Sequence, residues 1–134
     1  MSDSVLDRFS MKLAGETDQQ PEESTDDFDA FGWLRGVRDR ATMLELRHRD
    51  GSSTAFGYTW LEKAEFDPSE GITLQFAGKK VRILGRNLNK ETRPQVRLYR
   101  GILRQRVPWI QEADGATVME AGPDRVLVER FELK

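Results

Sequence analysis

Apolar residues alternate with polar ones most regularly across residues 71–88. The apolar side consists of five residues that flank a turn at Gly78: Ile72, Leu74, Phe76, Val81 and Ile83. Period-two alternation on both sides of a glycine-bearing turn is a strong short-range signal for a β-hairpin. We therefore predict two antiparallel strands here and expect the rest of the chain to pack around them.

Shorter alternating segments precede and follow this hairpin. Strands are predicted over 42–49, 54–58 and 63–66, over a short piece beginning at Trp109-Ile110, and over 125–133. Asp50-Gly51 and the segment 67–71 have turn-forming residues, and residues 59–61 are either one helical turn or a bend in a strand. Short strands at this spacing are typical of a small curved sheet or barrel.

Two segments have the periodicity of a helix. A helix is predicted over residues 29–38, with Asp29 as its cap. Apolar residues recur there at spacing three, starting one residue before the cap: Phe28, Phe31, Leu34 and Val37. Residues 94–107 begin with Pro94, which suits the first turn of a helix, and end before Pro108. The second segment is amphipathic, with arginines mostly on its polar side.

Together these segments predict a fold class and a domain organisation. The class is α+β: a small, strongly bent antiparallel sheet or barrel, a short N-terminal helix, and a C-terminal amphipathic helix followed by a strand. Residues 1–27 are polar and acidic and have few apolar side chains, so we expect a disordered arm. Residues 28–134 are expected to form a single small domain.

Composition restricts the class of protein further. The chain of 134 residues is 37% hydrophobic and 33% charged and contains no cysteine. Disulfides and thiolate metal sites are therefore excluded, which is compatible with a reducing cytoplasm. No run of eighteen apolar residues is present, and Asp7-Arg8 interrupts the only apolar start, so we expect neither a membrane span nor a secretory signal.

The net charge of −2 conceals two oppositely charged regions. Residues 1–30 hold nine acidic residues against two basic ones, whereas residues 79–110 hold ten basic residues against one acidic residue. An acidic arm and a basic block on one chain are the most informative electrostatic feature of the sequence.

Catalytic motifs are scarce. The single histidine, His48, ends a predicted strand, where a half-buried, hydrogen-bonded role is the more common one. No nucleophile elbow, phosphate-binding loop or dinucleotide-binding motif is found in the sequence. We predict no enzyme, no metal, no small-molecule cofactor and no catalytic residues. A small hydrolase centred on His48 is the weakest alternative.

The basic block is the best positive indication of function. Its candidate polyanion-binding residues are Lys79, Lys80, Arg82, Arg86, Arg97, Arg100 and Arg104. If those of the hairpin and those of the helix share a face, they would attract RNA or another polyanion. The competing interpretation is that they pair with acidic residues of the same chain. A third combines both: the acidic arm folds back on the basic face and competes with the ligand.

A protein–protein scaffold is the alternative class of function. Its contacts would come from Trp60, Trp109 and the edges of the sheet, since exposed edge strands can pair with another copy of the chain. A homo-oligomer is therefore a possible partner arrangement.

Residues 42–88 resemble the Sm-like (LSm/Hfq-type) small β-barrel. The likeness lies in Leu44-Glu-Leu-Arg-His-Arg-Asp-Gly51, a strand ending in a glycine turn, and in Val81-Arg-Ile-Leu-Gly-Arg-Asn-Leu88. The resemblance matches Gly85 and Asn87 to a family glycine and asparagine, which adds Asn87 to the binding candidates, and it implies a homo-oligomeric ring. The family's base-stacking loop is replaced here by residues 66–71. The chain also resembles a group of bacterial proteins of unassigned function.

Overall fold

The computed structural model describes residues 24–134, and these form a mostly β domain with two short α-helices. The elements follow in this order: β1 (Thr25–Asp27), β2 (Gly32–Leu34), β3 (Met43–Arg47), β4 (Ser53–Gly57), the 3-10 turn η3 (Tyr58–Trp60), β5 (Leu61–Asp67), β6 (Gly71–Phe76), β7 (Lys79–Arg86), α2 (Leu98–Leu103), β8 (Trp109–Gln111), α3 (Gly115–Glu120) and β9 (Leu127–Leu133). Residues 1–23, most of the predicted arm, lie outside the described part.

The predicted hairpin is confirmed as β6 and β7, the two central strands of a four-stranded sheet in the order β5-β6-β7-β9. Ile72 lies opposite Ile83 and Leu74 opposite Val81, and all four side chains are fully buried. Gly78 turns the chain with a φ of 74°. The alternation works because one face of this sheet covers the core.

A three-stranded sheet in the order β4-β3-β8 stands beside the first one. The predicted strands at 42–49 and 54–58 are confirmed, with the Asp50 carboxylate accepting from the Ser52 amide across the turn at 2.9 Å. β8 joins this sheet parallel to β3. Phe56 of β4 stacks on Phe76 of β6 at 4.8 Å, so the two sheets pack on each other.

The predicted N-terminal helix over 29–38 is wrong: this segment contains a tight turn and β2, which pairs with β1. Asp29 has a φ of 68°, and the amide of Phe28 donates to the carbonyl of Phe31. The spacing of three between the phenylalanines therefore comes from a turn that brings both rings together, 5.3 Å apart, and not from a helix. Residues 25–27, the end of the predicted arm, form β1.

The predicted basic helix is confirmed in place but is shorter than expected. α2 runs only from Leu98 to Leu103, because Gln95 and Gln105 adopt the left-handed conformation, with φ of 68° and 57°. No sequence pattern predicts α3, whose first turn is capped by the Asp114 carboxylate accepting from the Thr117 amide at 2.8 Å.

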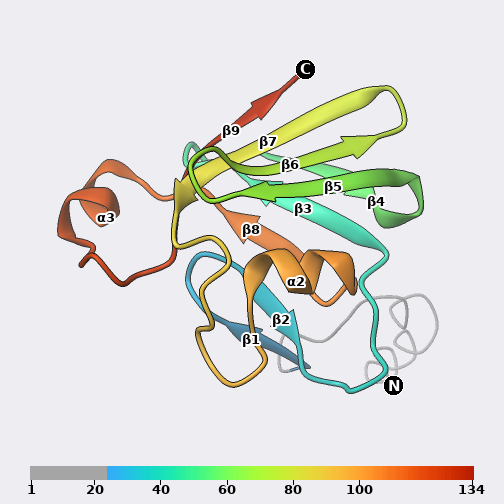
Figure 1. Cartoon of the computed structure of the whole chain (residues 1–134), viewed down its shortest axis with the longest axis horizontal. Coiled ribbons are helices and arrows are strands. Elements are labelled where there is room, and N and C mark those ends of the chain that lie inside the picture. Colours follow the sequence, from blue (N-terminus) through green and yellow to red (C-terminus); the bar gives the residue numbers. More distant parts are fainter. Residues whose placement is uncertain (1–23) are drawn as a thin grey trace, which may run out of the picture.

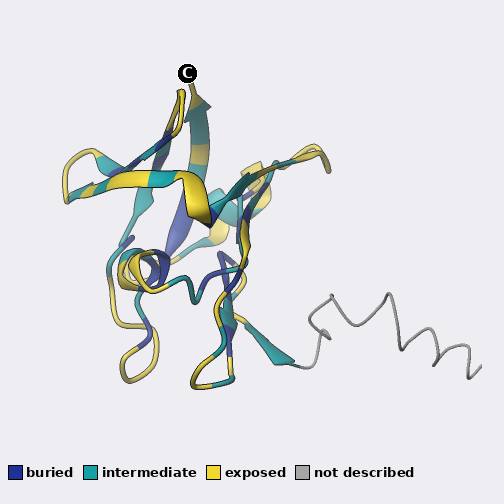
Figure 2. Ribbon diagram, turned by 90° about the vertical axis from the view of Figure 1, so that its right-hand side faces the viewer, coloured by how far each residue is buried: buried dark blue, intermediate teal, exposed yellow. Residues whose placement is uncertain are grey.

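Buried side chains from the three sheets and α2 form a single core. Its fully buried members include Phe31, Leu34, Leu44, Leu46, Ile72, Leu74, Val81, Ile83, Ile102, Ile110 and Val128. In Figure 1 α2 lies below β5, and in Figure 2 the buried segments face inward while the turns are exposed. No helix within residues 24–134 is long and apolar enough to cross a membrane.

Candidate functional site: an arginine groove

The lysines at the tip of the hairpin do not lie beside the predicted cations of α2 (Figure 1). Lys79 and Lys80 begin β7 at the tip of the hairpin, and the backbone of Lys80 pairs with that of Lys134, the C-terminal residue. In Figure 1 the C-terminus lies at the top of the molecule, whereas α2, which carries Arg100, lies below β5. Neither lysine forms an ion pair with any residue in the described part of the chain.

Three of the predicted cations are paired with acidic side chains. Arg82 lies 3.3 Å from Glu132 and 3.6 Å from Glu70. Arg86 lies 3.1 Å from Glu129, and Arg97 lies 3.8 Å from Glu91. Arg100 and Arg104, by contrast, are exposed and form no ion pair within residues 24–134. Ion pairing is thus the main role of the β7 arginines.

Asn87 has a structural role in this fold. Its φ is 58°, and its side-chain amide donates to the carbonyls of Pro123 at 2.9 Å and Arg125 at 2.8 Å. These bonds fix the loop before β9 to the end of β7. The amide hydrogens that a nucleotide would use are therefore already engaged.

The two tryptophans proposed for protein contacts differ. Trp60, at the end of η3, has 61% of its surface exposed, next to Met43 at 47%. Trp109 is partly buried, with the Arg47 guanidinium 4.4 Å from its ring centroid. Its indole also fills the space over Gly32, where an added Cβ would lie 2.5 Å from the ring nitrogen. Trp60 is available for a partner, and Trp109 packs inside the fold.

His48 makes contacts typical of a half-buried histidine in a β-domain. Its Nε2 lies 3.0 Å from the Thr54 hydroxyl, and its ring meets Phe131 edge-on at 5.5 Å. No cluster of three histidine, aspartate or glutamate side chains within residues 24–134 is arranged to hold a metal ion.

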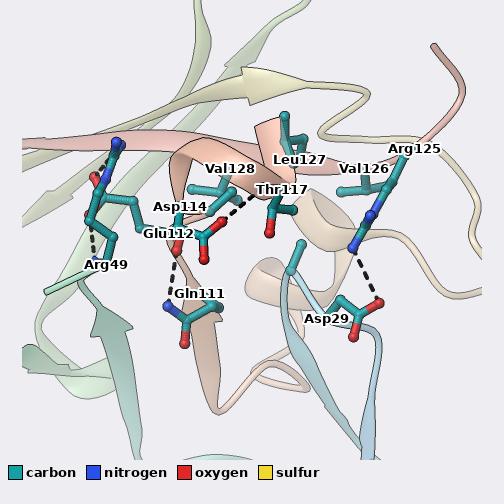
Figure 3. Close-up of a pocket in the computed structure, with 12 residues that line it drawn as sticks. Asp29, Arg49, Gln111, Glu112, Asp114, Thr117, Arg125, Val126, Leu127 and Val128 are labelled. Atoms are coloured by element: carbon teal, nitrogen blue, oxygen red, sulfur yellow. Dashed lines mark hydrogen bonds and ion pairs between the residues drawn. The ribbon is translucent and has the colours of Figure 1, made fainter. Parts of the chain in front are cut away.

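A depression of about 280 Å³ lies between the β1–β2 turn, α3 and the start of β9 (Figure 3). Its charged residues are already engaged: Arg49 lies 3.4 Å from Glu112, and Arg125 lies 3.4 Å from Asp29. Asp114 caps α3, and the hydrogen bonds from Thr117 lower the pKa of its carboxyl. The depression holds no unpaired charge to attract an ion.

A second depression, of about 420 Å³, has a very different lining. Four of its lining residues are arginines, and none of its lining residues is acidic. We call it the arginine groove and define it by nine residues: Trp33, Val37, Arg40, Arg93, Pro94, Gln95, Val96, Arg104 and Arg106. They come from β2 and the following loop, from the segment before α2, and from the segment after α2.

Arg106 shapes one wall of the groove. Its guanidinium donates to the carbonyls of Leu34 at 2.6 Å, of Val37 and Asp39 at 3.1 Å, and of Gly36. The 34–39 loop is thus folded around a cation, which lies 5.8 Å from the Trp33 ring centroid. Burial and the nearby charge of Arg40 lower the pKa of Arg106, against the opposing effect of Asp39.

Arg93 also lines the groove and is held by β1. Asp26 accepts from Arg93 at 2.7 Å and from Arg35 at 2.8 Å, and Arg93 lies 5.1 Å from the Phe28 ring centroid. The hydrogen bonds from Arg93 and Arg35 lower the pKa of the Asp26 carboxyl. One carboxylate therefore orients two guanidiniums without occupying the groove.

Arg40 and Arg104 are the available cations of the groove. Both side chains are exposed. Arg40 donates only to the carbonyl of Asp39, at 3.1 Å, and Arg104 has no side-chain partner among the described residues. A guanidinium presents parallel N–H donors that match two oxygens of a phosphate or carboxylate. The groove can therefore bind an anion between two fixed and two free arginines.

Sequence analysis found this groove only in part. Arg104 is one of the predicted binding residues, and Arg93 and Arg106 belong to the basic block, but Arg40 lies outside every predicted element and outside that block. No local pattern connects the segments 33–40, 93–96 and 104–106, because only the tertiary fold brings them together.

Acid is expected to remove the contribution of Asp26 to stability. The folded-state pKa lies below its ordinary value of 3.8, so the stabilisation is present above that value and is lost as the pH falls through the folded-state pKa. We expect Asp26→Asn to cost up to about 1 kcal/mol at neutral pH and progressively less between about pH 5 and about pH 2. Urea titrations over this range measure the difference. A cost that does not change with pH, or that equals that of the exposed Asp124→Asn, would contradict this assignment.

No protein-family model, curated protein or solved structure matches the chain.

Proposed function

We propose that this protein is a non-enzymatic interaction module that binds RNA or a similar polyanion in the arginine groove. The observation that supports it is the convergence of four guanidiniums from separate segments on one depression without acidic residues. Like charges repel, so a fold gains nothing from gathering them unless an anion compensates. Backbone carbonyls compensate Arg106 and Asp26 compensates Arg93, but nothing in the described part of the chain compensates Arg104.

The groove residues have different roles in the proposed binding. Arg93 and Arg106 are fixed by their partners and give the groove its shape, which limits the entropy lost when a ligand binds. Arg40 and Arg104 would contact phosphate oxygens. Val37, which is 87% exposed, and Trp33 would give apolar surface for a sugar or base.

The size of the groove favours a few contacts with a flexible chain over a long duplex interface. A volume of about 420 Å³ holds a small part of a ligand, of the order of one or two nucleotides. Two free arginines would neutralise about two phosphates, which corresponds to a slope of about −1.4 for log K against log salt with a single strand. Binding should therefore be modest and sensitive to salt.

The Sm-like barrel, the homo-oligomer and a cytoplasmic location are part of this proposal. Five successive strands, β3 to β7, with a glycine turn after β3, support the likeness to the barrel. β4 and β5 are the edges of their sheets and could pair with another copy. A chain without cysteine suits the reducing compartment in which RNA is found.

A protein–protein scaffold is the second candidate, and Trp60 favours it. The indole stands on the corner between β4 and β5 and is 61% exposed, beside Met43. An exposed tryptophan next to an edge strand is a typical anchor for a protein partner.

Loss of the two free groove arginines should weaken polyanion binding. We expect Arg40→Ala/Arg104→Ala to bind a fluorescein-labelled oligouridine at least about tenfold more weakly at low salt, with a salt slope smaller in magnitude by about 1.4. Fluorescence anisotropy at several salt concentrations measures both quantities.

The matched control is Lys79→Ala/Lys80→Ala, which removes the same charge at the hairpin tip. It should leave affinity and slope nearly unchanged. Equal losses in the two double variants would mean that only net charge matters and that the groove is no site. Failure of the unaltered protein to bind the oligonucleotide or heparin at low salt would overturn the proposed function.

A further inference from the structure

The chain enters the described structure beside the arginine groove. The carbonyl of Ser24 accepts from the amide of Arg35 at 3.0 Å, and in the β1–β2 ladder Thr25 lies opposite Leu34 and Asp26 opposite Trp33. Trp33 lines the groove, and Leu34 is one of the residues whose carbonyl binds Arg106. Whatever precedes Ser24 is therefore covalently tethered next to these arginines.

An acidic residue near this entry point already contacts a groove arginine. Asp26 lies 2.7 Å from Arg93 and 2.8 Å from Arg35, on a strand of only three residues. The contact places one carboxylate of β1, that of Asp26, against a guanidinium of the groove. The next acidic residues toward the N-terminus are Glu23 and Glu22, directly before Ser24.

The preceding segment has the charge that the groove lacks. Residues 1–23 contain six acidic residues against two basic ones, and four of the six lie between Glu16 and Glu23. An extended chain advances about 3.3–3.6 Å per residue, so Glu16 can reach about 28 Å from Ser24 and Glu22 about 7 Å. The four carboxylates are therefore tethered within about 28 Å of Ser24, whose carbonyl is bonded to the Arg35 amide, two residues after Trp33 of the groove.

We propose that the acidic segment 16–23 binds in the arginine groove of the same chain and competes there with the polyanion. The competing ligand in this inference is taken from the proposed function. The choice of the acidic segment as the bound partner is based on the contacts of Ser24 and Asp26. Tethering gives the segment an effective concentration of about 1 mM or more, so even weak ion pairing fills the groove part of the time. Because the contact is ionic and close to the surface, salt weakens it.

Spin labelling tests the contact without any polyanion. The chain has no cysteine, so Thr17→Cys carries a nitroxide at one defined place within the full-length protein. We expect it to broaden the backbone amide signals of groove residues such as Val37, Gln95 and Arg104. The matched control is the same labelled chain with Asp18→Asn/Glu22→Gln/Glu23→Gln, which keeps the tether and removes three of its four negative charges. Broadening of the groove should decrease in this control and at high salt.

Equal broadening of the groove in both labelled chains would overturn the proposal, because proximity alone would then explain it. Mixing labelled protein with isotope-labelled, nitroxide-free protein tests the other occupant. If the nitroxide of one molecule broadens the groove signals of another, the groove binds the segment of a second copy. That result would refute the intramolecular contact.

Competition is measured with the oligouridine. The unlabelled triple variant Asp18→Asn/Glu22→Gln/Glu23→Gln should bind about three- to tenfold more tightly than the unaltered chain at low salt, with the difference disappearing at high salt. The control is Glu62→Gln/Glu120→Gln/Asp124→Asn, which changes the net charge equally at exposed positions outside the groove. An equal gain in both triple variants would refute competition at the groove. If no variant binds the oligonucleotide, the proposed function fails, and the spin-label result still decides whether the segment occupies the groove.

Discussion

Gly85→Ala is expected to destabilise the folded protein by about 3 kcal/mol or more, at the severe end of overpacking substitutions. An added Cβ at this position would lie 2.0 Å from the carbonyl oxygen of Leu127 and 3.0 Å from the Cα of Val128. Both obstacles belong to the backbone of β9, so no rotamer change can relieve the clash. The β7–β9 ladder would have to separate where its register already shifts, between Leu84 and Gly85.

Urea unfolding measures this cost, and Gly122→Ala is the matched control, because nothing lies within 4 Å of a Cβ added there. We expect the control to change the free energy of unfolding by less than about 0.5 kcal/mol. Similar costs for the two variants would show that β9 can move away from β7. The result also bears on the Sm-like resemblance, since close packing of β9 is a sufficient reason for a glycine here.

Phe31→Ala should cost about 3–5 kcal/mol, the usual range for removing a buried aromatic side chain. Phe31 is fully buried, stacks on Phe28 at 5.3 Å, and forms a β-bridge with Ile110 of β8. Its loss would leave a cavity where the β1–β2 hairpin joins the three-stranded sheet. The groove would lose a support at the same time, because β2 carries Trp33.

The control for this substitution is Met119→Ala, since Met119 is 85% exposed on α3 and its truncation should cost little. Chemical unfolding gives the free energies. Phe31→Leu should fall between the alanine variant and the unaltered protein because it fills part of the cavity. A cost for Phe31→Ala as small as that for Met119→Ala would mean that the hairpin is not anchored through this ring.

The sequence predicted the elements whose determinants are local. The β6–β7 hairpin follows from alternation and one glycine, and the turn at Asp50-Gly51 follows from two turn-forming residues. The helix prediction for residues 29–38 is wrong for a physical reason. The tight turn at Asp29 brings Phe28 and Phe31 together, and these two residues have the spacing that is also typical of a helix. Whether residues with this spacing form a helix or a turn depends on the strand with which they pair. That strand lies elsewhere in the sequence, so the local pattern does not reveal it.

The candidate site was harder to predict because its charges are balanced by distant residues. Arg82 lies opposite Glu132 in the β7–β9 ladder, fifty positions along the chain, so the basic block loses charge through a pairing that local sequence does not reveal. The groove depends in the same way on three separated segments. The distribution of charge along the sequence predicts the basic region. The fold decides which of its cations have no acidic partner among the described residues.

The assembly of the groove from segments 33–40, 93–96 and 104–106 also has a consequence for biosynthesis. A ribosome releases the acidic N-terminus first, and the arginine pair after α2 emerges only when most of the polypeptide has been translated. During that interval Arg40 is already present, but the groove is not complete, because Arg104 and Arg106 have not yet been added. A nascent chain that stalls before Arg104 would therefore carry the acidic segment together with an incomplete arginine groove.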